Sequence, residues 1–216
     1  MARKKRVWYP GATYHVMNRG NRRTPIFSDH EDYLAFLKYV QKVQEKYPFK
    51  LHGICLMPNH YHMAIETISD DLGKIIQSIS SIYAGYYNHR HNLSGHLFQG
   101  RYTACLINDE RYFLEVSRYI HLNPVKANLV QSPEDYLYSS YRLFRKISDN
   151  NSNDVNKATL ILDHVMKNMI YTERTLSAFD NNSDQYIAFV RDKLSHSEHE
   201  AMIQNDIKED CFGLPA

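Results

Sequence analysis

The chain has 216 residues and a hydrophobic content of 43%, enough for one ordinary core with an appendage. No apolar run reaches the roughly 18 residues of a membrane span, and the basic N-terminus lacks the apolar stretch of a signal peptide. The three cysteines lie far apart and form no CxxC pair, which argues against a disulfide framework and a structural zinc site. We therefore expect a cytoplasmic protein without a membrane segment.

The net charge of +2 conceals an asymmetry along the chain. Residues 1–148 hold 20 Lys and Arg against 12 Asp and Glu, whereas residues 149–216 hold 6 against 12. The sign changes at a polar, turn-rich segment over 149–154. We therefore predict a main domain over 1–148 and an acidic, mainly helical extension over 149–216. A basic body suits a polyanion such as nucleic acid.

The first half of the chain contains a strand and a helix by their patterns. Alternating β-type residues predict a strand over 13–18. Ser28 and Glu31 have the spacing of a capping box. Apolar residues at helical spacing then predict a helix that ends before Pro48.

Two further strands are predicted over 51–57 and 60–66, on either side of a Pro-Asn turn. Ser69 is a candidate cap for the helix that follows. The buried stripe of that helix is expected at Leu72, Ile75, Ile76, Ile79, Ile82 and Tyr86.

The pattern ends with a strand over 103–107 and a helix over about 109–122, with Asn108 as its cap and Pro124 as its stop. The order βαββαβ predicts an α+β, ferredoxin-like antiparallel sheet with helices on one face. In the extension, the apolar residues near helical spacing are Leu160, Ile161, Val165 and Ile170. This fold hosts many functions, so the candidate site has to indicate the activity.

His60 and His62 are one residue apart on a predicted strand, so both imidazoles point to the same face. Glu66 shares that face, whereas Tyr61 faces the other side. Two adjacent imidazoles can hold a divalent metal; the alternative is a pair of surface or hydrogen-bonded histidines.

Tyr119 and Asn123 stand four residues apart at the end of a predicted helix, which places them on one face if the last turn holds. A tyrosine hydroxyl can attack a phosphodiester and form a covalent phosphotyrosine. An amide oxygen beside it can complete a metal site. The chain has 17 tyrosines, and the alternative for Tyr119 is a core aromatic. His121 points off this face, and Glu66 is the more plausible polar neighbour.

Five ordered segments resemble the single-tyrosine HUH transposases, and most closely their REP-associated branch. They are MPNHYHMAIE (57–66), YIHLNPVKA (119–127), YHVMNRGNRRTPIF (14–27), GHLFQGRY (95–102) and DYLYSSYRLF (135–144). The resemblance covers roughly residues 7–146. It departs from the family at Tyr61, where the residue between the two histidines is usually bulky and apolar.

The resemblance implies that Tyr119 is the nucleophile and that the metal ligands are His60, His62 and Asn123. The implied activity is metal-dependent cleavage and rejoining of single-stranded, hairpin-associated DNA through a 5′-phosphotyrosine intermediate, as in DNA transposition. Family members use magnesium or manganese; the two imidazoles suit manganese better, because magnesium prefers oxygen ligands.

Two groups of residues are candidates for DNA binding, because relatives bind DNA hairpins and read nearby single-stranded bases. The first follows the first strand and can reach phosphates or base edges: Arg19, Asn21, Arg22 and Arg23. The second precedes the last strand, where the tyrosine can stack on a base: Gln99, Arg101 and Tyr102. The alternative for both groups is that these residues only form turns and lie on a solvated face without binding DNA.

Other functions stay open at this stage. The same motifs also fit a domesticated relative with the same chemistry or a non-catalytic protein that binds DNA hairpins. A zinc-stabilised protein of another role is a third alternative. A monomer and a homodimer both fit the sequence.

Overall fold

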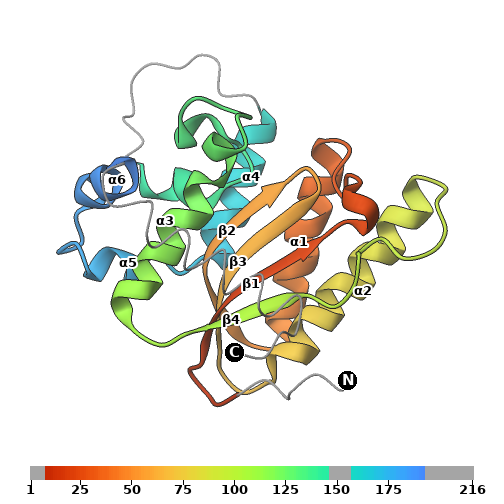
Figure 1. Cartoon of the computed structure of the whole chain (residues 1–216), viewed down its shortest axis with the longest axis horizontal. Helices are drawn as coiled ribbons and strands as arrows, with labels where there is room; N and C mark the ends of the chain where they lie inside the picture. The colour runs from red at the N-terminus through yellow and green to blue at the C-terminus, as the bar shows by residue number, and fades with distance from the viewer. Residues whose placement is uncertain (1–7, 146–156, 193–216) are drawn as a thin grey trace.

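The centre of the protein is a four-stranded antiparallel sheet with the strand order β2-β3-β1-β4 (Figure 1). The structure, a computed structural model, describes residues 8–145 and 157–192. Its strands are β1 (Thr13–Arg19), β2 (Phe49–Met57), β3 (His60–Thr67) and β4 (Thr103–Ile107). This is the order that a βαββαβ chain takes in a ferredoxin-like fold, so the predicted α+β class is confirmed.

Helices lie on both faces of the sheet. The two helices within the βαββαβ pattern, α1 (His30–Lys46) and α2 (Leu72–Arg90), pack side by side on one face as predicted. The next helix, α3 (Glu110–Lys126), packs against the opposite face (Figure 1). Because side chains alternate along a strand, each face has its own apolar cluster. Helices therefore cover both faces of the sheet, and α3 covers the face that carries His60 and His62.

The N-caps of the three main helices differ from those predicted. The side chain of Asp29, not Ser28, accepts hydrogen bonds from the first turn of α1, and Asp71 and Asp109 replace Ser69 and Asn108 for α2 and α3. In each case the N-cap is an aspartate one or two residues farther along the chain than the predicted residue. A carboxylate accepts the N–H groups and also interacts favourably with the positive end of the helix dipole.

The predicted buried stripe of α2 is confirmed at Leu72, Ile75, Ile76 and Ile79 and differs from the prediction only at its last two positions. Tyr83 and Tyr87 are buried, whereas Ile82 is 37% exposed and Tyr86 lies half-buried. The hydroxyl of Tyr83 donates to the carbonyl oxygen of Ile26, which gives this large ring a polar partner inside the core.

The helix α3 runs through Pro124 to Lys126 instead of stopping before the proline. Pro124 lacks an N–H and so cannot donate a helical hydrogen bond. The backbone hydrogen bonds of the helix continue beyond it, since Ala127 N–H donates to Asn123 O at 2.9 Å. The side chain of Asn123 also donates, from Nδ2 to Tyr119 O at 2.8 Å. The last turn of the helix is therefore kept in register beyond the proline.

The described part of the extension is helical, as predicted, with α4 (Lys157–Met169), α5 (Glu173–Ser177) and α6 (Ser183–Arg191). Its apolar face was predicted in part, since Ile170 is buried and Val165 packs against the core. Leu160 and Ile161, however, are exposed, and Leu162 and Met166 join the core beside α1 in their place. The predicted boundary at 149–154 lies outside the described residues, so the division into domains stays a prediction. No helix within 8–145 and 157–192 is long and apolar enough to cross a membrane.

The short helices η1 (Asn21–Arg23), η2 (Pro133–Asp135) and η3 (Ser140–Phe144) connect these elements. The last of them takes part in a buried chain of hydrogen bonds around His121. His121 Nε2 lies 2.8 Å from Ser140 Oγ, and its Nδ1 lies 2.6 Å from the hydroxyl of Tyr186 in α6. That hydroxyl is also 2.7 Å from Ser117 Oγ. His121 thus points away from the Tyr119 face of α3 and links this helix to the extension.

We predict that Tyr186→Phe destabilises the protein by about 1–3 kcal/mol, because His121 and Ser117 would keep buried polar atoms without their partner. For a chain of this size each kcal/mol lowers the melting temperature by about 2–4 °C. Thermal unfolding followed by circular dichroism measures the shift. Tyr171→Phe is the matched control, since this tyrosine is 42% exposed and should leave the melting temperature unchanged. Equal melting temperatures for both variants would contradict the prediction.

Candidate active site

Both histidines of the HxH pair point to the face of the sheet that α3 covers. Tyr61, between them, is fully buried in the opposite core, as the alternation of a strand requires. The ring centroids of His60 and His62 lie 5.0 Å apart. The predicted side-by-side arrangement of the two imidazoles is therefore present.

A third histidine, His15 of β1, completes the cluster. Met17 pairs with His62 and Arg19 with His60 in the β1–β3 register, so the neighbouring strand presents side chains to the same face. His15 Nε2 lies 3.0 Å from His62 Nδ1, and the two rings stack with centroids 5.2 Å apart. The sequence motifs did not single out His15, because its proximity depends on the strand register.

The Nδ1 atoms of both HxH histidines have partners. His60 Nδ1 lies 2.6 Å from Asn59 Oδ1, an atom that can only accept, so the Nδ1 carries the proton. His60 Nε2 then keeps its lone pair. For His62, the tautomer that donates from Nδ1 to His15 leaves Nε2 with a lone pair as well. Second partners of this kind orient metal-binding histidines in proteins.

Burial keeps these imidazoles neutral near pH 7. It lowers the pKa of His15 to about 4, and burial together with the charge of Arg19 lowers the pKa of His60 to about 4. Burial, and then the neighbouring His60, His15, Arg19 and Lys126, hold the pKa of His62 well below its usual value. Neutral imidazoles can bind a cation without first losing a proton.

The helix α3 places Tyr119 against the histidines. The ring centroid of Tyr119 lies 5.5 Å from that of His62 and 5.6 Å from that of His15, edge to face in both cases. Tyr119 and Asn123 are each 9% exposed and stand one turn apart, as predicted. The ammonium of Lys126, a further turn along, lies 4.9 Å from the Tyr119 ring centroid. Sequence reasoning missed Lys126, although its i+7 spacing from Tyr119 could have indicated it.

Within the described ranges, no group of three or more His, Cys, Asp and Glu side chains is arranged to hold a metal ion. The predicted ligand set contains only two such residues, His60 and His62, and takes its third donor from the amide of Asn123. The amide is held on α3 by its hydrogen bond to Tyr119 O.

Glu66 forms a structural bridge at the far end of the same face. Its carboxylate lies 3.0 Å from Lys50 Nζ and 2.9 Å from His52 Nε2, and Arg174 of α5 is 3.5 Å away. Partial burial raises the pKa of Glu66, but the hydrogen bonds from Lys50 and His52 outweigh it, and the pKa lies below its usual value. These contacts favour a role in joining α5 to the sheet over a role beside Tyr119.

Most of the first predicted DNA-binding group lies in a tight turn, which we call the arginine loop (residues 20–24). Arg19 is the last residue of β1 rather than a loop residue, whereas Asn21, Arg22 and Arg23 are exposed in η1. A Cβ at Gly20 would lie 2.2 Å from the carbonyl oxygen of Thr24, so the turn requires glycine there.

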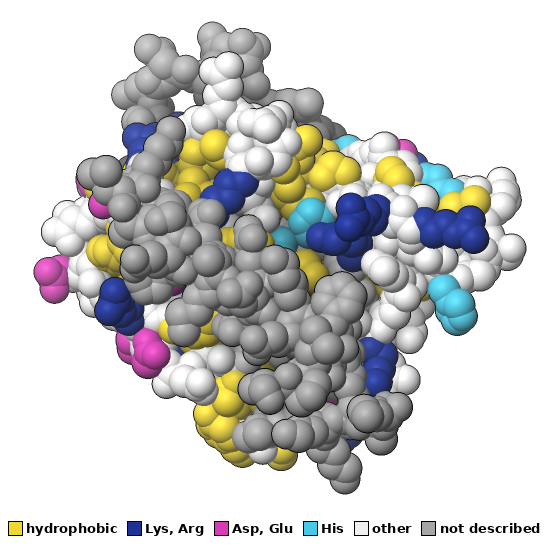
Figure 2. All heavy atoms as spheres, in the orientation of Figure 1, with side chains coloured by type: hydrophobic (Ala, Val, Ile, Leu, Met, Phe, Trp, Pro, Cys, Tyr) yellow, Lys and Arg dark blue, Asp and Glu magenta, His cyan; other side chains and the backbone are white. Residues whose placement is uncertain are grey.

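The second predicted group lies beside the arginine loop. Gln99 N–H donates to Arg19 O at 2.9 Å, and Asn21 N–H donates to Leu97 O at 2.8 Å. Gln99 and Arg101 are exposed. Figure 2 shows Lys and Arg side chains adjoining histidine on the right half of the visible face, whereas most acidic side chains in view lie on the left. The backbone hydrogen bonds thus join the two groups, and the pairing of Arg19 with His60 places them at the end of the sheet that carries the HxH pair.

Tyr102, which the sequence predicts to stack on a base, is largely buried, and its contact with DNA stays a prediction. Tyr102 is only 9% exposed and belongs to the core cluster beneath α2. Its apolar contacts explain its position better than a DNA contact does.

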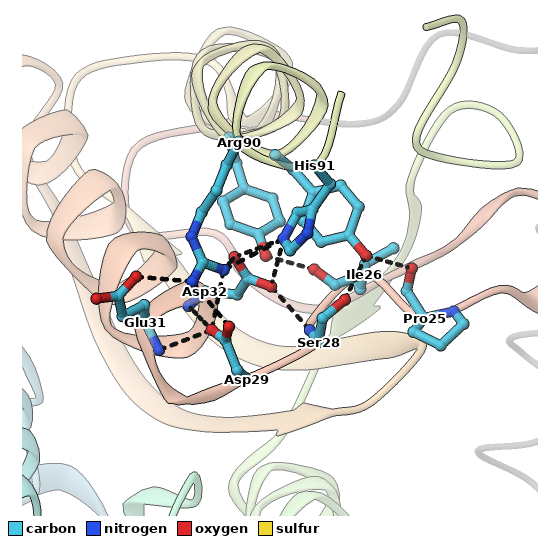
Figure 3. Close-up of polar contacts among 10 residues, drawn as sticks. Pro25, Ile26, Ser28, Asp29, Glu31, Asp32, Arg90 and His91 are labelled. Carbon is cyan, nitrogen blue, oxygen red and sulfur yellow. Dashed lines mark hydrogen bonds and ion pairs between the residues drawn. The ribbon is translucent and has the colours of Figure 1, made fainter. Parts of the chain in front are cut away.

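A cluster of charged side chains around the buried Asp32 holds the segments that carry both groups (Figure 3). Asp32, fully buried in α1, lies 2.7 Å from Arg90 NH1 and 3.0 Å from His91 Nε2 at the end of α2. Its second oxygen also accepts from Ser28 N–H at 2.8 Å. The cluster thereby joins the chain just after the arginine loop to the chain just before the 95–102 segment.

Comparisons with known proteins agree with this architecture. A solved REP-associated tyrosine transposase bound to a REP hairpin has a TM-score of 0.58 at 20% identity, covering 73% of this chain and 96% of that one. A protein of Haemophilus influenzae described as a candidate REP-associated tyrosine transposase is 26% identical over 123 residues, which are 51% of this chain and 69% of that protein. The fold is thus that of the tyrosine transposases.

The family model described as "Transposase IS200 like" matches residues 9–123, more than half of the chain. The protein therefore belongs to the IS200-like transposase family, and the resemblance seen in the sequence motifs is confirmed.

We predict that the buried histidines make the stability fall in acid. The folded pKa values of His15 and His60 are about 4, and burial lowers the pKa of His121 to about 3, against an ordinary value of 6.5. Between these values the unfolded chain binds more protons, so the free energy of unfolding decreases as the pH falls from about 6.5 to about 4. Each histidine contributes a loss of about 1.4 kcal/mol per pH unit.

Urea unfolding at about pH 7, 6 and 5 measures this dependence. A free energy of unfolding that stays constant over this range would contradict the burial of neutral imidazoles.

Proposed function

We propose that this protein cuts and rejoins single-stranded DNA beside hairpins, with Tyr119 as the nucleophile and with His60, His62 and Asn123 as ligands of a magnesium or manganese ion. The observation that carries the proposal is the placement of the Tyr119 ring 5.5 Å from that of His62, under a helix that also carries Asn123. Membership of a transposase family supports the same reaction class.

The residues at the site fit a divalent metal. His60 and His62 are neutral, their Nδ1 atoms have partners, and their Nε2 atoms can serve as ligands, while the amide oxygen of Asn123 supplies a harder donor. When bound, the metal would polarise a phosphate oxygen and hold the phosphate in line with the attacking hydroxyl. Manganese suits this mixed nitrogen and oxygen set better than magnesium.

The chemistry is a transfer of the phosphoryl group between two oxygens. The Tyr119 oxygen attacks phosphorus, the bond from phosphorus to the 3′ oxygen breaks, and the tyrosine proton is balanced by the proton that the 3′ hydroxyl gains. The product is a 5′-phosphotyrosine and a free 3′ hydroxyl. A 3′ hydroxyl can attack the phosphotyrosine in turn, so rejoining consumes no external energy source. Lys126, next to the ring, stabilises the phenolate charge during attack.

The arginine loop and the 95–102 segment supply the DNA surface. Arg22, Arg23 and Arg101 are exposed cations suited to phosphates, and Asn21 and Gln99 can reach base edges. Arg19 is closer to the chemistry, since its charge acts on both HxH histidines. A hairpin is the proposed partner because the solved transposase of similar fold is bound to one.

We predict that wild-type protein with manganese forms a covalent adduct with 3′-labelled single-stranded DNA that carries a hairpin, and that Tyr119→Phe forms none. The label must be on the 3′ side because the 5′-phosphotyrosine retains that fragment. Chelation of the metal should also abolish the adduct, and denaturing gel electrophoresis detects it.

The binding of the same DNA is the control for this experiment. Tyr119→Phe should bind as the wild type does, since it lacks only the hydroxyl. Arg22→Ala should bind more weakly, with a salt dependence reduced by about one unit, because one phosphate contact is lost. Binding without any adduct, across hairpins of several sequences, would overturn the catalytic proposal and leave a hairpin-binding protein.

A further inference from the structure

Asn59 lies between the metal-binding face and the arginine loop and contacts both. It occupies the turn between β2 and β3, directly before His60. Its Oδ1 accepts from His60 Nδ1 at 2.6 Å, and its Nδ2 donates to Arg23 O at 3.1 Å. Its backbone oxygen accepts from Gly20 N–H at 2.8 Å. One amide side chain thus holds a predicted metal ligand and the backbone of the loop.

The arginine loop needs such support. Arg22 and Arg23 have φ angles of 53° and 61°, in the left-handed region that bulky side chains rarely adopt. Conformations of this kind persist only where the surroundings hold them. Within the loop, Thr24 N–H donates to Asn21 O at 2.9 Å, and the Asn59 amide provides a hydrogen bond from outside the loop.

The same amide sets the orientation of His60. Because Nδ2 donates to Arg23 O, the oxygen of the amide must face His60, and the imidazole can only donate to it from Nδ1. A flip of the amide would place a donor against the His60 N–H and a lone pair against the Arg23 carbonyl. The loop therefore determines which nitrogen of His60 remains available.

We propose that Asn59 is a positioning residue that couples the arginine loop to the metal site, so that metal binding at His60 orders the loop and an ordered loop favours metal binding. The proposal rests on the metal dependence of the proposed function. By linkage, the coupling acts equally in both directions. In the reaction, the arginine loop would therefore adopt its DNA-binding conformation when the metal ion is bound.

Two substitutions separate the two contacts. Asn59→Asp keeps an oxygen acceptor for His60 and removes the donor for Arg23 O. Asn59→Ala removes both contacts. Asn168→Asp is the matched control, because this exposed asparagine of α4 undergoes the same chemical change far from the site in sequence and on a different element.

The test measures two quantities in the full chain with manganese as the probe. Calorimetric titration gives the manganese affinity, and hydrogen exchange followed by mass spectrometry gives the protection of a peptide covering residues 20–27 with and without the metal. In the wild type and Asn168→Asp, manganese should slow exchange in this peptide. In Asn59→Asp, the affinity should exceed that of Asn59→Ala, because the acceptor for His60 is kept, but the protection by manganese should be lost. In Asn59→Ala, the affinity should fall about 10–100-fold and the protection should also be lost.

Two results would overturn the proposal, and they are distinguishable. If the wild type binds manganese and all three variants show the same protection as the wild type, the coupling is absent while the proposed function stands. If the wild type binds no manganese and Tyr119 forms no adduct, the metal-dependent function fails and the coupling fails with it.

Discussion

The packing of α3 across the histidine face of the sheet is the contact on which the rest of the site depends. It buries His15 and His62 and partly buries His60, and this burial keeps their imidazoles neutral. The same helix brings Tyr119 edge-on to His62. The burial of the histidines and the placement of Tyr119 therefore have one cause, and a shift of this helix would disturb both.

Hydrogen bonds fix α3 on its face opposite Tyr119. The buried hydrogen bonds of His121 connect it to Ser140 and to Tyr186 of α6, so part of the acidic extension supports α3. Because α4 also contributes Met166 to the main core, the described extension is integrated with the sheet domain. In a buried network of this kind, a polar atom that loses its hydrogen-bond partner costs free energy. The network therefore favours the one orientation of α3 in which every member keeps its partner.

Much of this arrangement could be predicted from local patterns. The alternation of a strand placed His60 and His62 on one face, and the four-residue spacing placed Asn123 beside Tyr119. Features that depend on contacts between distant segments were missed: His15 requires the β1–β3 register, and the burial of Tyr102 requires the packing of the sheet against α2. The helix caps failed for another reason, since Ser, Asn and Asp all cap well and the sequence offers more than one within two residues.

The central claim is that a metal ion binds between His60, His62 and Asn123, next to Tyr119. Anomalous X-ray scattering from crystals soaked in manganese tests it most directly. The account predicts a single strong peak within coordination distance of the Nε2 atoms of both histidines and of the amide oxygen of Asn123. A peak at another cluster of residues, or none at the HxH pair despite saturating manganese, would contradict it.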